Sequence, residues 1–158
     1  MEQGLDKAIA EAIEAARTSM TAGFGGPFGA AVLKDGKVIS IAANSVLRDH
    51  DPSAHAEVNA IRKAGQVLGT HDLGGCILYA TGYPCPMCLS AIIWANIDTV
   101  YFGCEAWEAE SIGFRDDFIY RFIEAKRNDA HVLKLVQMGH QECRALYGAY
   151  EKMEKTLY

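Results

Sequence analysis

A histidine and two cysteines stand in two short motifs that limit what this chain can fold into. The motifs are His55-Ala56-Glu57 and Pro84-Cys85-Pro86-Met87-Cys88. Imidazole and thiolate are both good zinc ligands, and one His with two Cys leaves a tetrahedral zinc one ligand short. The open position would hold a water whose pKa falls to about 7. Glu57 is close enough to His55 to reach that water without binding the metal.

Two alternative interpretations of the cysteines remain open. A thiol–disulfide redox pair also uses Cys-x-x-Cys at the start of a helix, but it leaves the His-Ala-Glu motif without a role. A structural zinc site needs a fourth protein ligand. Cys76, Cys104 and Cys143 are candidates, although their apolar surroundings are typical of core thiols. The joint pattern favours a catalytic zinc site.

Length and composition are those of an ordinary globular protein. The chain has 158 residues, of which 50% are hydrophobic and 22% charged, and we expect a single domain over residues 1–158. The net charge is −5 and no dense Lys/Arg cluster is present, which favours a small-molecule substrate over nucleic acid. No signal peptide or membrane-spanning run is visible, and the odd number of cysteines fits a reducing compartment. We therefore expect a cytoplasmic protein with no membrane partner.

Hydrophobic periodicity predicts alternating helices and strands. Apolar residues at three- and four-residue spacing indicate an amphipathic helix over residues 4–20. Asp35-Gly36 indicates a hairpin between strands at 28–34 and 37–43. The later elements expected are a helix ending near Leu68, strands over 76–81, 99–104 and 132–138, and helices over 86–96, 105–127 (broken near Gly113) and from Gln141. This order predicts an α/β fold, a three-layer α/β/α sandwich around one five-stranded mixed sheet.

The position of the histidine on its helix sets a geometric condition. Asp51 or Ser53 would cap the helix that runs to Leu68, which places His55 and Glu57 in its first turn. Two residues apart, these side chains would diverge by about 200° on a regular helix. They can share a metal site only if that site lies near the helix start. Cys85 would cap the following helix, which is apolar nearly all round and therefore expected to be buried.

Three segments resemble the cytidine deaminase-like superfamily: Gly25 to Ala30, Asp51 to Glu57, and Pro84 to Cys88. Within it, Gly113 to Ile119 and the final Leu157-Tyr158 are similar to bacterial guanine deaminases and the related plant guanosine deaminases. Two positions depart from the family pattern. Tyr83 replaces the usual Glu before Pro-Cys, and Arg115 stands where an acid is commoner, which bears on substrate choice.

The resemblance implies roles for individual residues. Zn²⁺ would be bound by His55, Cys85 and Cys88, and Glu57 would shuttle protons. The purine would be held by Asn44, Asp116 and Tyr158, with Phe28 lining the pocket and Asp116 also assisting the leaving amine. The resemblance further implies a homodimer in which the C-terminal segment of one subunit completes the neighbour's site.

The implied reaction is hydrolytic deamination of guanine to xanthine and ammonia. A deaminase of guanosine, cytosine or another base or nucleoside would use the same zinc chemistry. A tRNA adenosine deaminase would be expected to carry a basic tail, whereas Glu151 to Lys155 is mixed in sign. A non-catalytic, zinc-stabilised interaction module is the alternative from a different class.

Overall fold

The computed structural model of the protein describes residues 2–157. The chain divides into a first compact unit that ends at Asp116 and a second that begins at Asp117. The first unit contains the sheet and most of the helices, and the second contains two helices joined by a long connection. The single domain expected over residues 1–158 stays a prediction.

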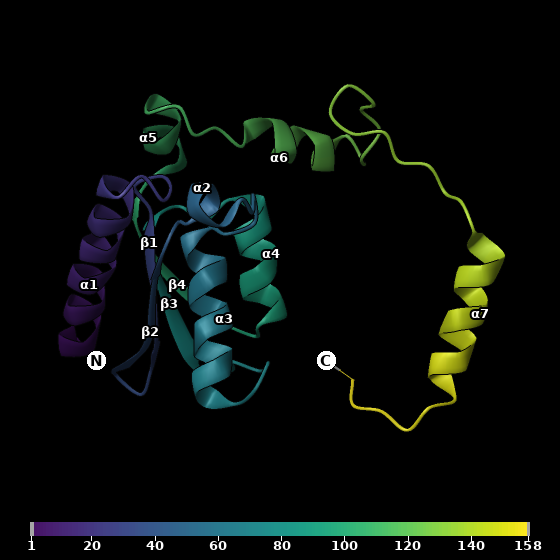
Figure 1. Ribbon diagram of the computed structural model, residues 1–158, viewed down its shortest axis with the longest axis horizontal. Helices are drawn as coiled ribbons and strands as arrows, with labels where there is room; N and C mark the ends of the chain where they lie inside the picture. Colours follow the sequence, from purple (N-terminus) through teal and green to yellow (C-terminus); the bar gives the residue numbers. More distant parts are fainter. Residues whose placement is uncertain (1, 158) are drawn as a thin grey trace. The chain divides into compact units, whose positions relative to one another are not determined.

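The first unit is a three-layer α/β/α sandwich, as the order of elements predicted (Figure 1). Its sheet has the order β2-β1-β3-β4, in which β1 is antiparallel to β2 and β3, and β3 is parallel to β4. Helix α1 covers one face, and helices α3 and α4 cover the other (Figure 1). The elements are α1 (Glu2–Thr21), β1 (Gly29–Lys34), β2 (Lys37–Ala43), α2 (Val46–Asp49), α3 (Ala56–Leu68), β3 (Cys76–Gly82), α4 (Pro86–Trp94), β4 (Thr99–Cys104) and α5 (Ala106–Ser111).

The sheet has four strands in the described part of the chain, where five were expected. The segment 132–138, predicted to be the last strand, forms no strand and lies in the second unit, between α6 (Asp117–Glu124) and α7 (His140–Glu151). A strand needs a neighbour for its backbone hydrogen bonds, and the second unit contains no other strand within its described residues.

The β1–β2 hairpin forms as Asp35-Gly36 predicted. Both residues have positive φ, 51° and 73°, which a type I′ turn requires at its two central positions. Lys34 and Lys37 form the first pair of the ladder. The turn sets the register next to it, and a shift of one residue between Leu33 and Val32 sets the register of the part of β2 that leads to Asn44.

Small residues let the helices approach the sheet closely. Ala56, Ala60 and Ala64 recur every fourth position on one side of α3, and all three are fully buried against the sheet. On the opposite face, Ala8 and Ala12 of α1 are also fully buried. The core is thus two apolar layers, one on each side of the sheet.

Helix α4 is not buried all round, which corrects the expectation drawn from its apolar sequence. Ile92 is buried against the sheet, but Ile93 and Trp94 are 72% and 74% exposed. The side of the helix that carries Ile92 packs on the sheet, and the side that carries Ile93 and Trp94 is exposed. The described helices include none that is long and apolar enough to cross a bilayer.

We predict that Gly29→Ala destabilises the first unit. Gly29 opens β1, and an added Cβ would overlap the carbonyl oxygen of Ala12 on α1. Overpacking of this kind costs about 1–3 kcal/mol in free energy of unfolding, measured by denaturant titration. Gly82→Ala is the control in the same unit, because a Cβ there meets only the Phe28 ring at 3.6 Å, an ordinary contact. An unchanged midpoint for Gly29→Ala would show that the helix and strand separate at little cost.

Candidate metal centre

The histidine lies at the start of α3 rather than inside its first turn. The helix begins at Ala56, and His55 is its N-cap, with extended backbone angles (φ −70°, ψ 155°). The expected helix start at Asp51 or Ser53 is therefore wrong, because residues 51–55 form a tight turn stabilised by local hydrogen bonds to Asp51 and Ser53. The condition that the site lie near the helix start is met.

The two cysteines occupy the start of α4 as predicted. Cys85 is the N-cap (φ −67°, ψ 169°), Pro86 is the first helical residue, and Cys88 lies one turn further. Strand β3 ends at Gly82, three residues before Cys85. The end of the strand thus delivers the cysteines to the same edge of the sheet as His55.

The three side chains converge on one point. His55 Nδ1 lies 3.5 Å from Cys85 Sγ and 3.4 Å from Cys88 Sγ, and the three atoms lie within 4.8 Å of one another. Tetrahedral zinc with ordinary Zn–N and Zn–S bonds would separate a nitrogen from a sulfur ligand by about 3.6 Å. The observed distances fit this value, and the donor set suits zinc. Zinc is therefore the cofactor that these residues can hold.

No fourth side chain joins this group in the part of the chain that the structure describes. The three residues are the group of His, Cys, Asp and Glu donors close enough to share an ion. Cys76, the first residue of β3, is a core thiol as expected. Cys104 and Cys143 are exposed, so the expectation of core thiols is wrong for these two. The arrangement favours a three-ligand site over structural zinc. A redox pair would leave the contact of His55 with both sulfurs unexplained.

The electrostatics of the cluster suit metal binding. A hydrogen bond from the Cys88 thiol, with a further one involving His55, lowers the pKa of Cys85 to about 4. The same thiol contact and burial raise the pKa of Cys88. Contact with Cys85 raises the pKa of His55 despite its partial burial. One thiolate is therefore present at neutral pH, and metal binding would release the proton of the second.

Glu57 lies beside the cluster but outside the ligand group. Its carboxyl is 8% exposed and contacts the Cys88 thiol. Burial raises the pKa of this carboxyl, since the charged form loses hydration. A buried acid next to a metal ligand, and not itself a ligand, is suited to accepting and returning protons.

Asn44 is buried at the end of β2, and its side chain is already oriented by the backbone. Its Oδ1 accepts hydrogen bonds from the amides of Gly26 (3.3 Å) and Val46 (3.2 Å). A Cβ at Gly25 would overlap that oxygen. The Gly25-Gly26 turn therefore does more than join a helix to a strand, a role that the sequence alone did not reveal.

Phe28 packs edge-to-face on Phe114, with ring centroids 4.9 Å apart. A Cβ at Gly26 would meet both rings at under 3 Å, so glycine is needed for this packing. The contact joins the glycine turn to the loop that carries Asp116, which is half-buried. Tyr158 lies outside the described residues. The roles of these residues towards a substrate stay predictions.

The two residues that depart from the family pattern lie on the surface. Tyr83 is 40% exposed and packs edge-to-face on Phe102 of β4, at 5.0 Å between centroids. Its amide donates to the carbonyl of Cys104, which extends the β3–β4 pairing towards the cysteines. Arg115 is exposed. Neither residue belongs to the metal-ligand group.

Comparison with known proteins gives consistent matches. Residues 3–104 match the family model described as the cytidine and deoxycytidylate deaminase zinc-binding region. A guanine deaminase of Bacillus subtilis is 48% identical over 116 residues, 73% of this chain and 74% of that protein. A tRNA-specific adenosine deaminase of Aquifex aeolicus is 47% identical over 76 residues, about half of each chain (48% and 50%).

Solved structures give the same result. The structure of Bacillus subtilis guanine deaminase superposes with a TM-score of 0.87, at 38% identity and 97% coverage of both chains. A guanine deaminase structure from Nitrosomonas europaea has a TM-score of 0.65 at 32% identity, with 69% of this chain and 63% of that one covered.

We predict that Cys88→Ser lowers zinc retention, because a hydroxyl is a much poorer zinc ligand than a thiolate. Zinc per chain, measured by elemental analysis after dialysis against a chelator, should fall from about one towards zero. Cys104→Ser is the matched control and should keep its zinc. Loss of zinc from Cys104→Ser would instead support a four-ligand structural site.

Proposed function

The chain belongs to the family defined by the cytidine and deoxycytidylate deaminase zinc-binding region, and from this membership we propose that it deaminates guanine to xanthine and ammonia. As a member it is a zinc-dependent aminohydrolase. The choice of guanine rests on one observation: the likeness to Bacillus subtilis guanine deaminase extends over 97% of both chains. The tRNA-specific adenosine deaminase of Aquifex aeolicus matches over only about half of its length. That of Buchnera aphidicola matches over 82% of both chains but is only 30% identical, against 48% for the guanine deaminase.

The chemistry starts from the ligand group. His55 Nδ1 and the sulfurs of Cys85 and Cys88 would hold zinc. When bound, zinc supplies a water of pKa about 7 and therefore a nucleophile near neutral pH. The structure supports this proposal through the close approach of three donor atoms at two helix starts.

Glu57 is the proposed acid–base residue. Its carboxyl would accept the proton of the attacking water and pass it to N3 of the purine as the new C2–O bond forms. It would then deliver the second proton of that water to the amino group that leaves C2 as ammonia, with Asp116 assisting the leaving amine. Burial of Glu57 supports this role, because a raised pKa lets one carboxyl both take and return a proton.

Asn44 is the proposed donor to the base. Since its Oδ1 is used by two backbone amides, the part of the side chain available to a ligand is the amide nitrogen, which can only donate. It would therefore face an acceptor of guanine, such as its carbonyl oxygen or a ring nitrogen. Asp116 would accept from the N–H donors of the base, Phe28 would line the pocket, and Tyr158 would complete it.

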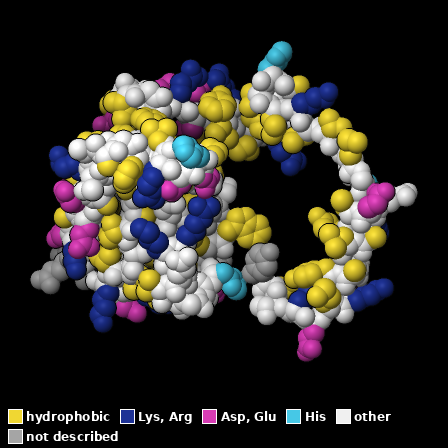
Figure 2. All heavy atoms as spheres, in the orientation of Figure 1, with side chains coloured by type: hydrophobic (Ala, Val, Ile, Leu, Met, Phe, Trp, Pro, Cys, Tyr) yellow, Lys and Arg dark blue, Asp and Glu magenta, His cyan; other side chains and the backbone are white. Residues whose placement is uncertain are grey.

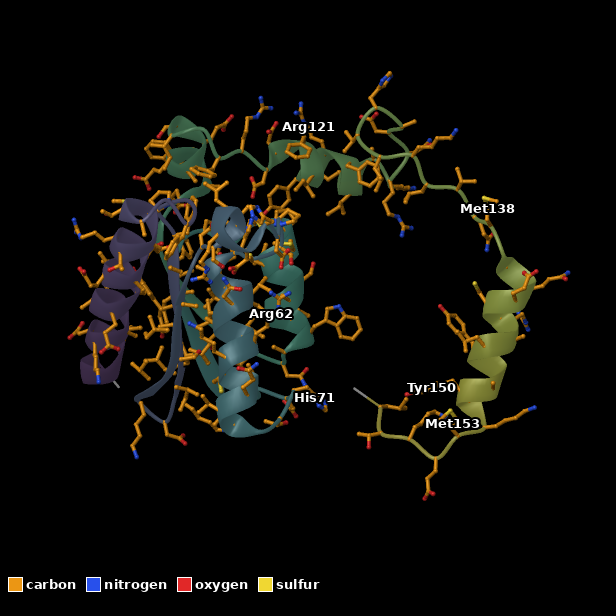
Figure 3. All side chains as sticks on the ribbon, in the orientation of Figure 1. Arg62, His71, Arg121, Met138, Tyr150 and Met153 are labelled. Atoms are coloured by element: carbon orange, nitrogen blue, oxygen red, sulfur yellow. The ribbon has the colours of Figure 1, made fainter. Side chains whose placement is uncertain are left out.

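We also propose a homodimer in which the C-terminal segment of one subunit contributes to the site of the other. Exposed apolar side chains on both units support this (Figure 2). In the first unit, β4 is an edge strand whose Phe102 is 39% exposed, and Ile93 and Trp94 of α4 are 72% and 74% exposed. In the second unit, the apolar run 132–138 is exposed along its length, ending at Met138 (Figure 3).

The remaining proposals concern setting and partners. We propose a cytoplasmic enzyme, because all five cysteines are free thiols, as a reducing compartment would keep them. A small base or nucleoside is the proposed substrate, with no nucleic-acid partner. The net charge of −5 supports this, since tRNA binding depends on a basic surface.

Ammonia release from a panel of substrates tests the proposed reaction. The zinc-loaded protein is assayed with guanine, guanosine, cytosine, adenine and a tRNA. We expect guanine to give the highest kcat/KM. A higher kcat/KM for another compound of the panel would replace guanine as the proposed substrate. No ammonia from any of the compounds would favour a non-catalytic zinc module.

We predict that Glu57→Gln keeps its zinc but loses turnover by about 10²–10⁴-fold, since an amide cannot transfer protons. Zinc per chain and kcat are measured on the same preparation. The exposed Glu124→Gln on α6 is a matched control that should leave both unchanged. Substantial activity in Glu57→Gln would remove this residue from the mechanism.

A further inference from the structure

We propose that Asn59 is a positioning residue that holds the strand end bearing Asn44 and the helix start bearing His55 in one fixed relation. Asn59 lies on α3, one turn after the metal-ligating histidine. Neither motif singled it out, and it is not among the metal ligands. The part of this inference that concerns substrate binding rests on the proposed role of Asn44, whereas the part that concerns the metal does not.

One amide group bonds to both segments. Asn59 Nδ2 lies 3.0 Å from the carbonyl oxygen of Ala43, 2.9 Å from Ser45 Oγ and 3.3 Å from the carbonyl oxygen of Ala54. Ala43 and Ser45 flank Asn44 on either side, and Ala54 immediately precedes His55. Asn59 Nδ2 therefore donates to oxygens of the residues on both sides of Asn44 and of the residue before His55.

The direction of the Ser45 contact is set by its neighbours. Ser45 Oγ donates to Asp49 Oδ2 at 2.6 Å, and the Arg48 guanidinium binds the same carboxylate at 2.7 and 3.0 Å. The hydrogen bond from Arg48 lowers the pKa of Asp49 to about 2, so this acceptor stays ionised at neutral pH. Because the hydroxyl hydrogen of Ser45 is used, its oxygen accepts from Asn59.

Two backbone hydrogen bonds connect the segments, and the side-chain amide of Asn59 adds a connection that neither of them makes. The amide of Ser45 donates to the carbonyl of Ala54 at 3.0 Å, and the amide of Asn59 donates to that of His55 at 2.9 Å. Neither bond involves the carbonyl of Ala43. Asn59 Nδ2 adds this third connection. The nitrogen has two hydrogens for three acceptor oxygens, so the longest contact, to the carbonyl oxygen of Ala54, shares a hydrogen with one of the other two.

The site tolerates little displacement, which is why this connection matters. Nδ1 of His55 fits zinc at 3.4–3.5 Å from the two sulfurs, and a shift of the turn before α3 would spoil that fit. The same shift would move the amide nitrogen of Asn44 relative to the metal. Asn59 therefore acts on substrate through Asn44 and on the metal through His55, without touching either ligand.

A groove of about 740 Å³ runs between α1 and α3, over β2. It is lined by Asn59 and Gln66, among others, and by Arg62, which extends from α3 (Figure 3). No metal ligand lines it. The groove provides a matched control, because Gln66 is an exposed amide two turns further along the same helix from Asn59.

The test compares Asn59→Leu with Gln66→Leu. Zinc affinity of the metal-free protein, measured by competition with a chromophoric chelator, should fall about tenfold for Asn59→Leu and stay unchanged for Gln66→Leu. The KM for guanine should rise about tenfold for Asn59→Leu. In an Asn44→Ala background, Asn59→Leu should leave KM unchanged, because the residue acts through Asn44.

Two results would overturn the proposal: zinc affinity equal to that of the unmodified protein, or the same rise in KM with and without Asn44. If guanine is not turned over at all, the proposed substrate fails while the zinc measurement still decides the role of Asn59. Should Asn59→Leu not fold, Ser45→Ala removes one of the three acceptors. It should then shift zinc affinity and KM by about threefold in the same directions, and no shift would overturn the proposal.

Discussion

The structure depends on the meeting of two helix starts at one edge of the sheet. His55 and Cys85 are both N-cap residues with extended backbone angles. Their side chains therefore project from the ends of α3 and α4, not from the sides of the helices. This geometry lets Nδ1 of His55 approach both sulfurs at 3.4–3.5 Å. It also lets Glu57, in the first turn, lie beside Cys88 without entering the ligand group. The helix starts thus keep the carboxyl proposed for proton transfer apart from the three residues that can hold the metal.

The sheet and the small residues of α3 hold those helix starts in place. Alanines at every fourth position allow α3 to lie close on the sheet, and its polar side is bonded to strand β2. Lys63 donates to the carbonyl of Ile41, and Asn59, four residues earlier, donates to that of Ala43. These two bonds also occupy outward-facing carbonyls of an edge strand, which limits pairing with another chain.

The fixed side chains of Asn44 and Phe28 bear on the proposed function. Asn44 cannot rotate to offer its oxygen, since two backbone amides already use it, and Phe28 is confined by Phe114 and Gly26. A site whose polar groups are fixed in advance discriminates strongly against ligands that leave them unpaired. If Asn44 and Phe28 contact the base as proposed, their fixed positions would restrict which bases the site accepts.

The local sequence indicated the metal-binding chemistry and most of the elements, and tertiary structure decided how they meet. The ligand types, the Asp35-Gly36 hairpin and the cap at Cys85 follow from neighbouring residues, because turn geometry and helix capping are local properties. The later start of α3, the exposure of Ile93 and Trp94, and the absence of a strand at 132–138 depend on which surfaces find a partner, and apolar periodicity does not contain that information. Asn59 shows the same limit. In the sequence, Asn59 looks like any polar residue on the surface of a helix. Only the folded chain brings the carbonyls of Ala43 and Ala54 to its side-chain amide.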